Sequence, residues 1–372
     1  MIDSLDVSYG DMWGSHQGPT HPDPMPSALA ARRHAAGMPY AVLLSSGERP
    51  LALIERWPRG RWRLYLFDDA SRRARMIDFV PLGTDKLLGV RNTRLTSSDE
   101  QGDEAGSESG EGRSRERIPH CLVPEFGDWR VFAPFLAQQG HEPAADAVLN
   151  DVSVEEGAGP LRPTGVERLF VPGSRDTPDG PAAVELGDAG MLRITSGQLA
   201  VTDPGFVSNP RTVAVPPGEY PVTLSLLRTA RSVEVAAARV TFHDAPPHAW
   251  EMALRPDEDP GLLGEGEFYG VGVDSGTVAF MDAIRAVDDE MLDDEVLDEQ
   301  VFVPLSFVDR PSVELPGTGT GPNLVAFTAG RGDGSYPVWI GRTEDGQAAC
   351  VVVDFRLHPT DRKQGDTGPS PA

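Results

Sequence analysis

Proline and glycine interrupt this chain so often that few stretches can continue as a long helix. The 372 residues include 34 Pro and 40 Gly, and 39% of the residues are hydrophobic. Proline lacks a backbone donor and clashes with the preceding helical turn, and both residues favour turns over element interiors. The length is sufficient for two domains. The sequence therefore predicts a mainly β fold with two antiparallel β-rich modules, a meander and a sandwich- or barrel-like sheet, and a few short helices.

Four apolar runs predict that the meander occupies residues 38–95. They are AVLLSS, LALIERW, RWRLYLFD and ARMIDFV, and the turn-forming segments GERP, PRG and DDASR separate them. Alternation of apolar with other residues in RWRLYLFD is typical of a strand with one buried face. The preceding residues, 1–37, are polar and rich in proline, so we expect them to form a flexible N-terminal arm.

Three other segments are predicted to lie outside the two β modules. Residues 96–117 contain no apolar side chain larger than alanine, which predicts a disordered acidic linker because little surface can be buried to offset the ordering entropy. Apolar side chains at helical spacing, including Val131 and Phe135, predict a helical connector over 118–160, in which PAADAVLNDV is a second short helix. Residues 359–372 are expected to be a disordered tail.

The strongest strand signals occur in a second β-rich domain, predicted over residues 161–358. EYPVTLSLLRTARSVEVAAARVTFHD predicts two long strands, and YPVWIGRTEDGQAACVVVDFRL predicts a hairpin with Asp345-Gly346 in its turn. CVVVDF is almost continuously apolar, which is typical of a central strand covered on both faces. DAIRAVDDEMLDDEVLDEQ has apolar residues near helical spacing on an acidic background and predicts one helix.

A series of motifs in this second domain resembles a known family. GQLAVTDP, PPGEYPVTLSL, AAARVTF, WEMAL, FYGVGVDSGTVAFMD and GSYPVWIGRTEDGQAACVVVDF occur in this order. The series is similar to the bacterial family catalogued as domain of unknown function 4241, and it covers about residues 166–357. The resemblance implies no particular activity, cofactor or catalytic residue. The N-terminal meander lies outside it.

The charge of the chain excludes some partners and favours others. A formal net charge of −24 and a pI near 4.6 argue against nucleic acid, which is bound by clustered Lys and Arg, and favour a basic protein partner. Cys121 and Cys350 stand far apart, so no disulfide framework is predicted. No apolar run approaches the ~20 residues of a membrane-spanning helix. We expect a cytoplasmic protein without a cofactor, and the sequence leaves its oligomeric state open.

One tripeptide raises the question of catalysis. Asp274-Ser275-Gly276, within YGVGVDSGTVAFMDA, is the local pattern around the catalytic aspartate of pepsin-like and retroviral proteases. Such enzymes need two carboxylates that share a proton. The other tripeptide of this kind, Asp366-Thr367-Gly368, lies in the tail that is expected to be disordered, so the second carboxylate would have to come from another copy of the chain. One hypothesis is therefore a homodimeric aspartic-type hydrolase centred on Asp274. The other is a hairpin turn between FYGVGV and TVAFM, where Asp and Gly are both favoured.

A few charged residues are candidates for a ligand or metal site. Divalent cations such as Ca²⁺ prefer several oxygen ligands at once, so the carboxylates of Asp274, Asp282, Glu219 and Glu251 are the metal candidates. Arg239 lies in the apolar run AAARVTF, and a buried arginine needs a partner. We expect a structural salt bridge between Arg239 and either Glu251 or Asp274 rather than a substrate clamp.

Other catalytic signatures are missing from the sequence. GxSxG, GxxxxGK[ST], HExxH and a helix-opening GxGxxG do not occur. The sequence thus favours a non-catalytic binding or interaction module, such as an immunity-type protein that neutralises a basic partner. The alternatives are the hydrolase centred on Asp274 and a divalent-cation-binding β-domain.

Overall fold

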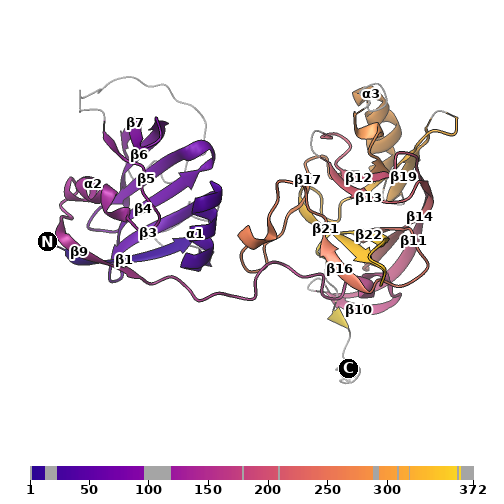
Figure 1. The fold of residues 1–372 in the computed structure, drawn as a ribbon. Coiled ribbons are helices and arrows are strands. Elements are labelled where there is room, and N and C mark those ends of the chain that lie inside the picture. The colour runs from indigo at the N-terminus through magenta and orange to yellow at the C-terminus, as the bar shows by residue number, and fades with distance from the viewer. Residues whose placement is uncertain are drawn as a thin grey trace, which may run out of the picture. The chain divides into compact units, whose positions relative to one another are not determined.

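The structure is a computed structural model that describes residues 2–12, 23–95, 119–177, 180–207, 210–287, 293–307, 310–317, 319–357 and 360–361. The chain divides into two compact units (Figure 1). Unit 1 contains Met1–Gly159 and Gly261–Glu265, and unit 2 contains Pro160–Pro260 and Gly266–Ala372. Both units are mainly β, which confirms the predicted fold class. The predicted acidic linker over 96–117 lies outside the described residues.

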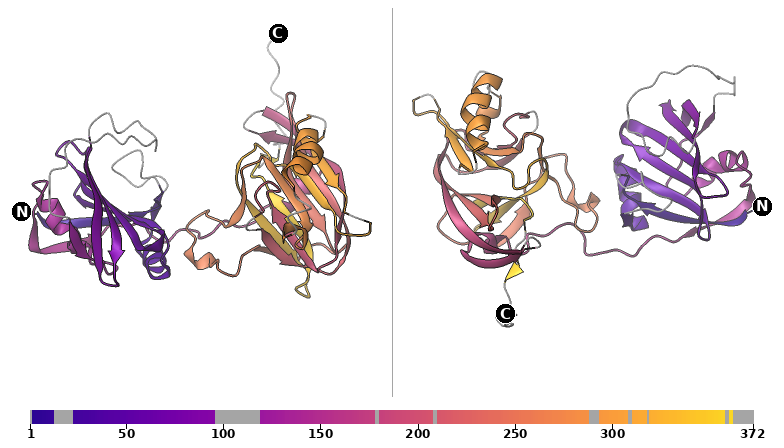
Figure 2. Two further views of the ribbon diagram at one scale, coloured as in Figure 1. Left: turned by 90° about the horizontal axis from the view of Figure 1, so that it is seen from above. Right: turned by 180° about the vertical axis from the view of Figure 1, so that it is seen from behind.

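Unit 1 contains one nine-stranded sheet with strand order β2-β1-β3-β4-β5-β6-β7-β8, to which β9 adds by pairing with β1. The predicted meander is its consecutive antiparallel part, from β3 to β7. The turned views show the curvature of this sheet (Figure 2). The strands are β1 (Ile2–Gly10), β2 (Pro24–Met25), β3 (Tyr40–Ser46), β4 (Arg49–Trp57), β5 (Arg61–Phe67), β6 (Arg73–Leu82), β7 (Lys86–Arg94), β8 (His120–Leu122) and β9 (Pro143–Asp151).

The N-terminal segment is not the flexible arm that we predicted. Its first residues form β1, which pairs antiparallel with β3 and parallel with β9. Leu5, Val7 and Tyr9 alternate with more polar residues and are buried, so the strand signal was present before the proline-rich part begins. Helix α1 (Ser27–Ala36) follows, also within the predicted arm.

The segment predicted as a helical connector is helical only over a short stretch. A 3₁₀ turn at Trp129–Phe132 leads into α2 (Ala133–Ala137), and both bury aromatic rings in the core of unit 1. PAADAVLNDV, predicted as a second helix, instead forms β9. Its partner β1 is far away in the sequence, so the parallel pairing that selects the strand was not visible locally.

Unit 2 contains two sheets. The larger has the order β16-β21-β22-β15-β14-β11-β10-β23, with β17 also paired to β21, and the smaller has the order β13-β12-β18-β20-β19. The strands of the larger sheet are β10 (Gly173–Thr177), β11 (Gly180–Ile194), β14 (Gly218–Arg228), β15 (Val233–Thr241), β16 (Ala249–Met252), β17 (Gly270–Val273), β21 (Gly334–Arg342), β22 (Ala348–Asp354) and β23 (Thr360–Asp361). The strands of the smaller sheet are β12 (Gln198–Thr202), β13 (Arg211–Ala214), β18 (Thr277–Asp282), β19 (Ser312–Leu315) and β20 (Leu324–Thr328).

The core of unit 2 lies between these two sheets. Side chains from the larger sheet, such as Leu224 and Val351, and from the smaller sheet, such as Phe280 and Phe327, belong to one buried cluster. The β14–β15 and β21–β22 hairpins are present as predicted. Strand β22 lies between β21 and β15 and is buried along its whole length, which confirms that it is central.

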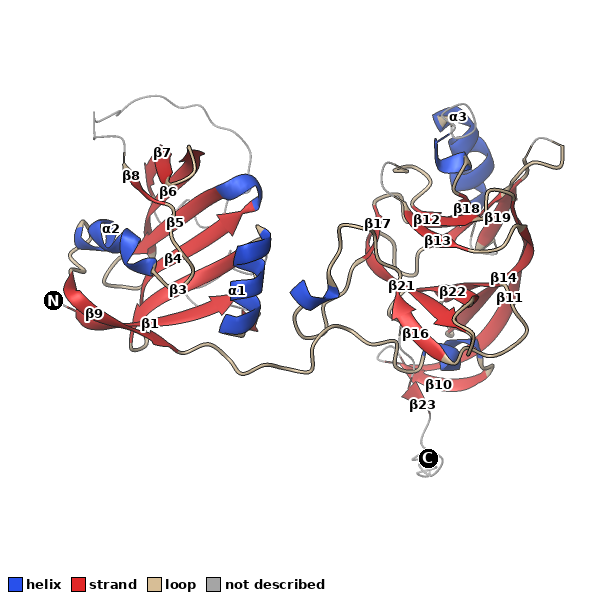
Figure 3. Ribbon diagram, viewed as in Figure 1, coloured by secondary structure: helices blue, strands red, loops and turns tan. Residues whose placement is uncertain are grey.

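A helical segment covers the outer face of the smaller sheet (Figure 3). It consists of α3 (Asp294–Leu297), a π-helical turn (Asp298–Phe302) and α4 (Val303–Leu305). This segment lies at the end of the predicted helix and extends beyond it. It begins at Asp294 because Asp293 caps α3 by accepting the N–H of Glu295 at 2.9 Å. No helix in the described ranges is both long and apolar enough to cross a bilayer.

Candidate functional site

The Asp274-Ser275-Gly276 turn does not close a hairpin. It joins β17, which pairs with β21 in the larger sheet, to β18, which pairs with β12 and β20 in the smaller one. The turn is therefore a corner at which the chain passes between the two sheets, and the hairpin prediction was wrong. Gly276 has a φ of +67°, a conformation that glycine adopts without the Cβ penalty of other residues.

A buried carboxylate that the sequence analysis overlooked holds this corner in place. Asp203, which is 1% exposed, follows β12 and reaches the corner from the neighbouring strand. Its Oδ2 accepts the backbone N–H groups of Asp274 and Ser275, each at 2.8 Å. Its Oδ1 accepts the Ser275 hydroxyl at 2.6 Å and the N–H of Gly205 at 2.8 Å. Four donors thus compensate the burial of one carboxylate.

Asp282 makes the same set of contacts at the other end of the strand pair. It is fully buried at the end of β18 and binds the Thr195-Ser196 corner, where β11 of the larger sheet passes into β12 of the smaller. The N–H groups of Thr195 and Ser196 donate to its Oδ2 at 2.6 and 2.9 Å. Its Oδ1 accepts the Ser196 hydroxyl and the N–H of Ile284. Burial opposes ionisation of Asp282, but the hydrogen bonds from Ser196 and Thr195 outweigh it and hold its pKa below the ordinary value.

A short internal repeat underlies this correspondence. TSGQLAVTD, residues 195–203, aligns without a gap with DSGTVAFMD, residues 274–282. Each copy is a Ser-Gly corner, a buried strand and a terminal aspartate, and the two strands pair antiparallel. The aspartate of each copy binds the corner of the other. This repeat is the signal in the sequence that identifies Asp203 as the counterpart of Asp282.

The arrangement determines what the predicted site residues are able to do. Asp282 and Asp274 lie at opposite ends of β18, and the oxygens of Asp282 are occupied by N–H and O–H donors, so the two carboxylates do not form a common cation site. The Asp274 side chain is exposed and has no hydrogen bond or ion pair in the described part of the chain. Across the described ranges, no group of three His, Cys, Asp or Glu side chains is placed to hold a metal ion.

The remaining candidates lie apart from this corner. Glu219 accepts a hydrogen bond from Arg193 at 2.7 Å, and Glu251 accepts one from Arg342 at 2.5 Å. Both are exposed ion pairs. Arg239 was predicted to pair with Glu251 or Asp274, and this was wrong.

The guanidinium of Arg239 instead lies over the ring of Phe170, 4.3 Å from its centroid. The ring belongs to the 3₁₀ turn Val166–Phe170, which covers this face of the larger sheet. Burial lowers the pKa of Arg239. Burial also raises the pKa of the neighbouring Cys350 thiol to about 11.

A cavity of about 640 Å³, open to solvent, lies beside the edge strand β16. Trp250 and Met252 of β16 and Trp339 of β21 line it, and they share one face of the sheet because Met252 is paired with Trp339. Arg162, in the Pro160–Pro163 segment, contributes to the rim. All of these residues belong to unit 2.

Exposed apolar side chains occur in the loop that Asp203 stabilises and in the helical segment that contacts this loop. Gly205 lies against Phe302 of the π-helical turn, since a Cβ at Gly205 would be 3.4 Å from the Phe302 Cζ. Phe206, next to Gly205, is 58% exposed, and Val303, next to Phe302, is 55% exposed. Phe307, about one helical turn further along, is 58% exposed.

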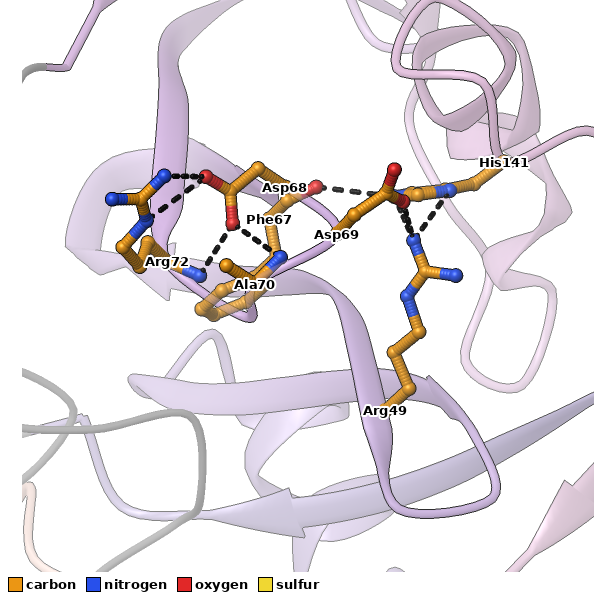
Figure 4. A network of polar contacts seen from close by, with 7 residues as sticks. All are labelled: Arg49, Phe67, Asp68, Asp69, Ala70, Arg72 and His141. Carbon is orange, nitrogen blue, oxygen red and sulfur yellow. Dashed lines mark hydrogen bonds and ion pairs between the residues drawn. The ribbon is translucent and has the colours of Figure 1, made fainter.

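Unit 1 contains a separate polar network (Figure 4). Arg49 forms an ion pair with Asp69, and its Nη2 lies 3.3 Å from each ring nitrogen of the buried His141. His141 Nε2 lies 3.2 Å from the carbonyl oxygen of Phe67. Asp68 accepts two backbone N–H groups of the same turn, each at 2.9 Å. The network fixes the β5–β6 turn against the loop after α2, and we interpret it as structural.

Part of the chain matches a known family. Residues 192–353 match the family described as "Protein of unknown function (DUF4241)". A search of curated proteins and a search of solved structures gave no match. The matched segment begins within β11 and ends within β22, so it contains both copies of the internal repeat.

Proposed function

Residues 192–353 belong to the DUF4241 family, and from this premise we propose that unit 2 is a non-catalytic domain that binds a basic protein partner. The observation that carries the proposal is the exposure of three apolar side chains: Phe206 in the loop after β12, and Val303 and Phe307 in or directly after the helical segment that contacts this loop. The same helical segment also carries exposed acidic residues. We name these three apolar side chains the apolar patch. Single exposed apolar residues are ordinary, but aromatic residues in a group are typical of protein-binding surfaces.

Hydrogen bonds hold the backbone that precedes Phe206. Asp203 binds the N–H of Gly205 within the loop and the Ser275 corner beside it. An aromatic side chain on backbone that is already held by hydrogen bonds loses little further entropy when a partner binds. Phe206 is thus suited to be a binding anchor.

The charge next to the apolar patch favours a partner with Lys or Arg beside its own apolar side chains. Glu295 and Glu299 are exposed and precede Val303 along the helical segment at intervals of four residues. Residues at this spacing lie on neighbouring turns of one helix face. Opposite charges at the border of an interface accelerate association and select the partner. The net charge of −24 acts in the same direction over longer distances.

We propose that the protein acts in the bacterial cytoplasm, where it neutralises its basic partner in the manner of an immunity protein. Both cysteines are free, as is usual in a reducing compartment.

Capture from a lysate of the native cells tests the proposal. Immobilised wild-type protein is compared with Phe206→Ser/Phe307→Ser, with Glu295→Gln/Glu299→Gln and with the control Ile284→Ser, which removes an exposed apolar residue outside the apolar patch. The expected partner is basic, is captured by wild type and by the control, and is released as salt is raised from 0.1 to 1 M, where the screening length falls from about 10 to about 3 Å. Both double variants should capture less of it. Equal capture by all four proteins, or no basic protein at all, would contradict the proposal.

A further inference from the structure

The cavity beside β16 carries a second inference, independent of the apolar patch. We propose that it is a binding site for a small organic anion, a carboxylate with an aromatic or aliphatic body. The volume of about 640 Å³ lies within the range of about 300–1,000 Å³ that is usual for small-molecule sites.

The walls of the cavity favour an apolar body. Trp250, Met252, Leu254 and Trp339 line it together with prolines of the Pro160–Pro163 segment. The Trp250 ring is held in place because its Nε1 donates to Glu167 at 2.7 Å. This fixed indole provides flat apolar surface at a small entropic cost.

The polar groups of the cavity favour an anion over a cation. Arg342 is already paired with Glu251, so neither charge is free for a ligand. Arg162 is exposed and has no ion pair among the described residues, which leaves its guanidinium available to a carboxylate. A ligand with a negatively charged acceptor group therefore matches the site.

Two probes of nearly the same shape, one charged and one neutral, test the proposal on the full-length protein. Binding of 4-phenylbutyrate and of its neutral amide is followed by tryptophan fluorescence and by saturation-transfer NMR, and octanoate provides an aliphatic carboxylate. The acid should bind about threefold to fivefold more tightly than the amide, as expected for one partly solvated ion pair. Arg162→Gln should abolish this preference while leaving amide binding unchanged.

Two further variants separate the site from general effects. Trp250→Ala should weaken the binding of the acid and of the amide equally, because it removes apolar surface rather than a charge. Arg231→Gln, in the exposed turn between β14 and β15, removes a cation elsewhere and should change neither. Circular dichroism confirms that each variant is folded.

Three results would overturn the proposal. They are failure of both carboxylates to bind at millimolar concentration, equal affinity of acid and amide for wild type, and an unchanged preference in folded Arg162→Gln. Since the probes do not involve the apolar patch, failure here leaves the protein-binding proposal unaffected, and the reverse also holds.

Discussion

Asp203 and Asp282 stand at the ends of two paired antiparallel strands, and each binds the corner that precedes the other's strand. Asp203 follows β12 and accepts the N–H groups of the corner before β18, whereas Asp282 ends β18 and accepts those of the corner before β12. The two corners carry the chain between the sheets, so the two carboxylates connect the layers of unit 2. This relationship makes the aspartates the first residues to test.

Asp203→Ala should destabilise unit 2 by about 2–4 kcal/mol, because it leaves buried donors without acceptors. Asp274→Ala removes an exposed carboxylate from the same corner and should change the free energy of unfolding by less than about 0.5 kcal/mol. Denaturant unfolding of the full chain gives the energies, and hydrogen exchange of β18 assigns them to unit 2. Equal effects of the two substitutions would disprove the assigned role of Asp203.

The contribution of Asp282 to stability should depend on pH in a defined direction. Its pKa is lowered in the folded protein, whereas an unfolded aspartate titrates near 3.9, so protons bind the unfolded state preferentially in this range. The stabilisation is fully present above about pH 4 and is lost as the pH falls through the lower, folded pKa. The stability difference between wild type and Asp282→Asn should therefore shrink from pH 5 to pH 3 in urea unfolding experiments. A difference that stays constant would show that ionised Asp282 is not the stabilising species.

The buried ion pair between Arg211 and Glu258 should matter more than the exposed pair between Arg342 and Glu251. Arg211 is 2% and Glu258 5% exposed, and two hydrogen bonds of 2.6 and 2.9 Å join them. Glu258→Gln leaves a buried guanidinium without its counter-charge, so it should cost about 3 kcal/mol. Glu251→Gln should cost less than about 1 kcal/mol. Thermal unfolding of both variants shows which substitution costs more stability. A similar loss of stability in both variants would refute the prediction.

Asp274→Asn tests the hydrolase hypothesis directly. The Asp274 carboxylate is exposed, and Asp203, which does lie at the corner, is occupied by four donors. We therefore expect no cleavage of casein by the wild-type protein between pH 4 and 6, and no difference in the variant. Sedimentation of the wild type gives its oligomeric state in the same samples. Cleavage that the wild type performs and Asp274→Asn abolishes would revive a dimeric aspartic-type enzyme.

Elements fixed by local patterns could be predicted from the sequence. The meander from β3 to β7 and the β21–β22 hairpin rest on alternation and on turn residues such as Asp345-Gly346, both of which are read within a few residues. β9 was not predicted because its strand conformation depends on pairing with β1, which is far away in the sequence.

The candidate site could be predicted only in part, for a similar reason. A hairpin turn and a corner between sheets both favour Asp and a glycine with positive φ, so Asp274-Ser275-Gly276 looks the same in either. The difference lies in strand pairing, which is set by distant residues. Arg239 was expected to need an anion, but Phe170, distant in the sequence, stacks on its guanidinium.

The position of β1 has a consequence for synthesis of the chain on the ribosome. Its antiparallel partner β3 follows within a few dozen residues, but its parallel partner β9 emerges only after residues 11–142 have been made. At about 5–20 residues per second, translation leaves that edge without its native partner on the order of ten seconds. An open strand edge can pair with another chain during that time. Nascent unit 1 is thus most exposed to association between neighbouring ribosomes just before β9 is completed.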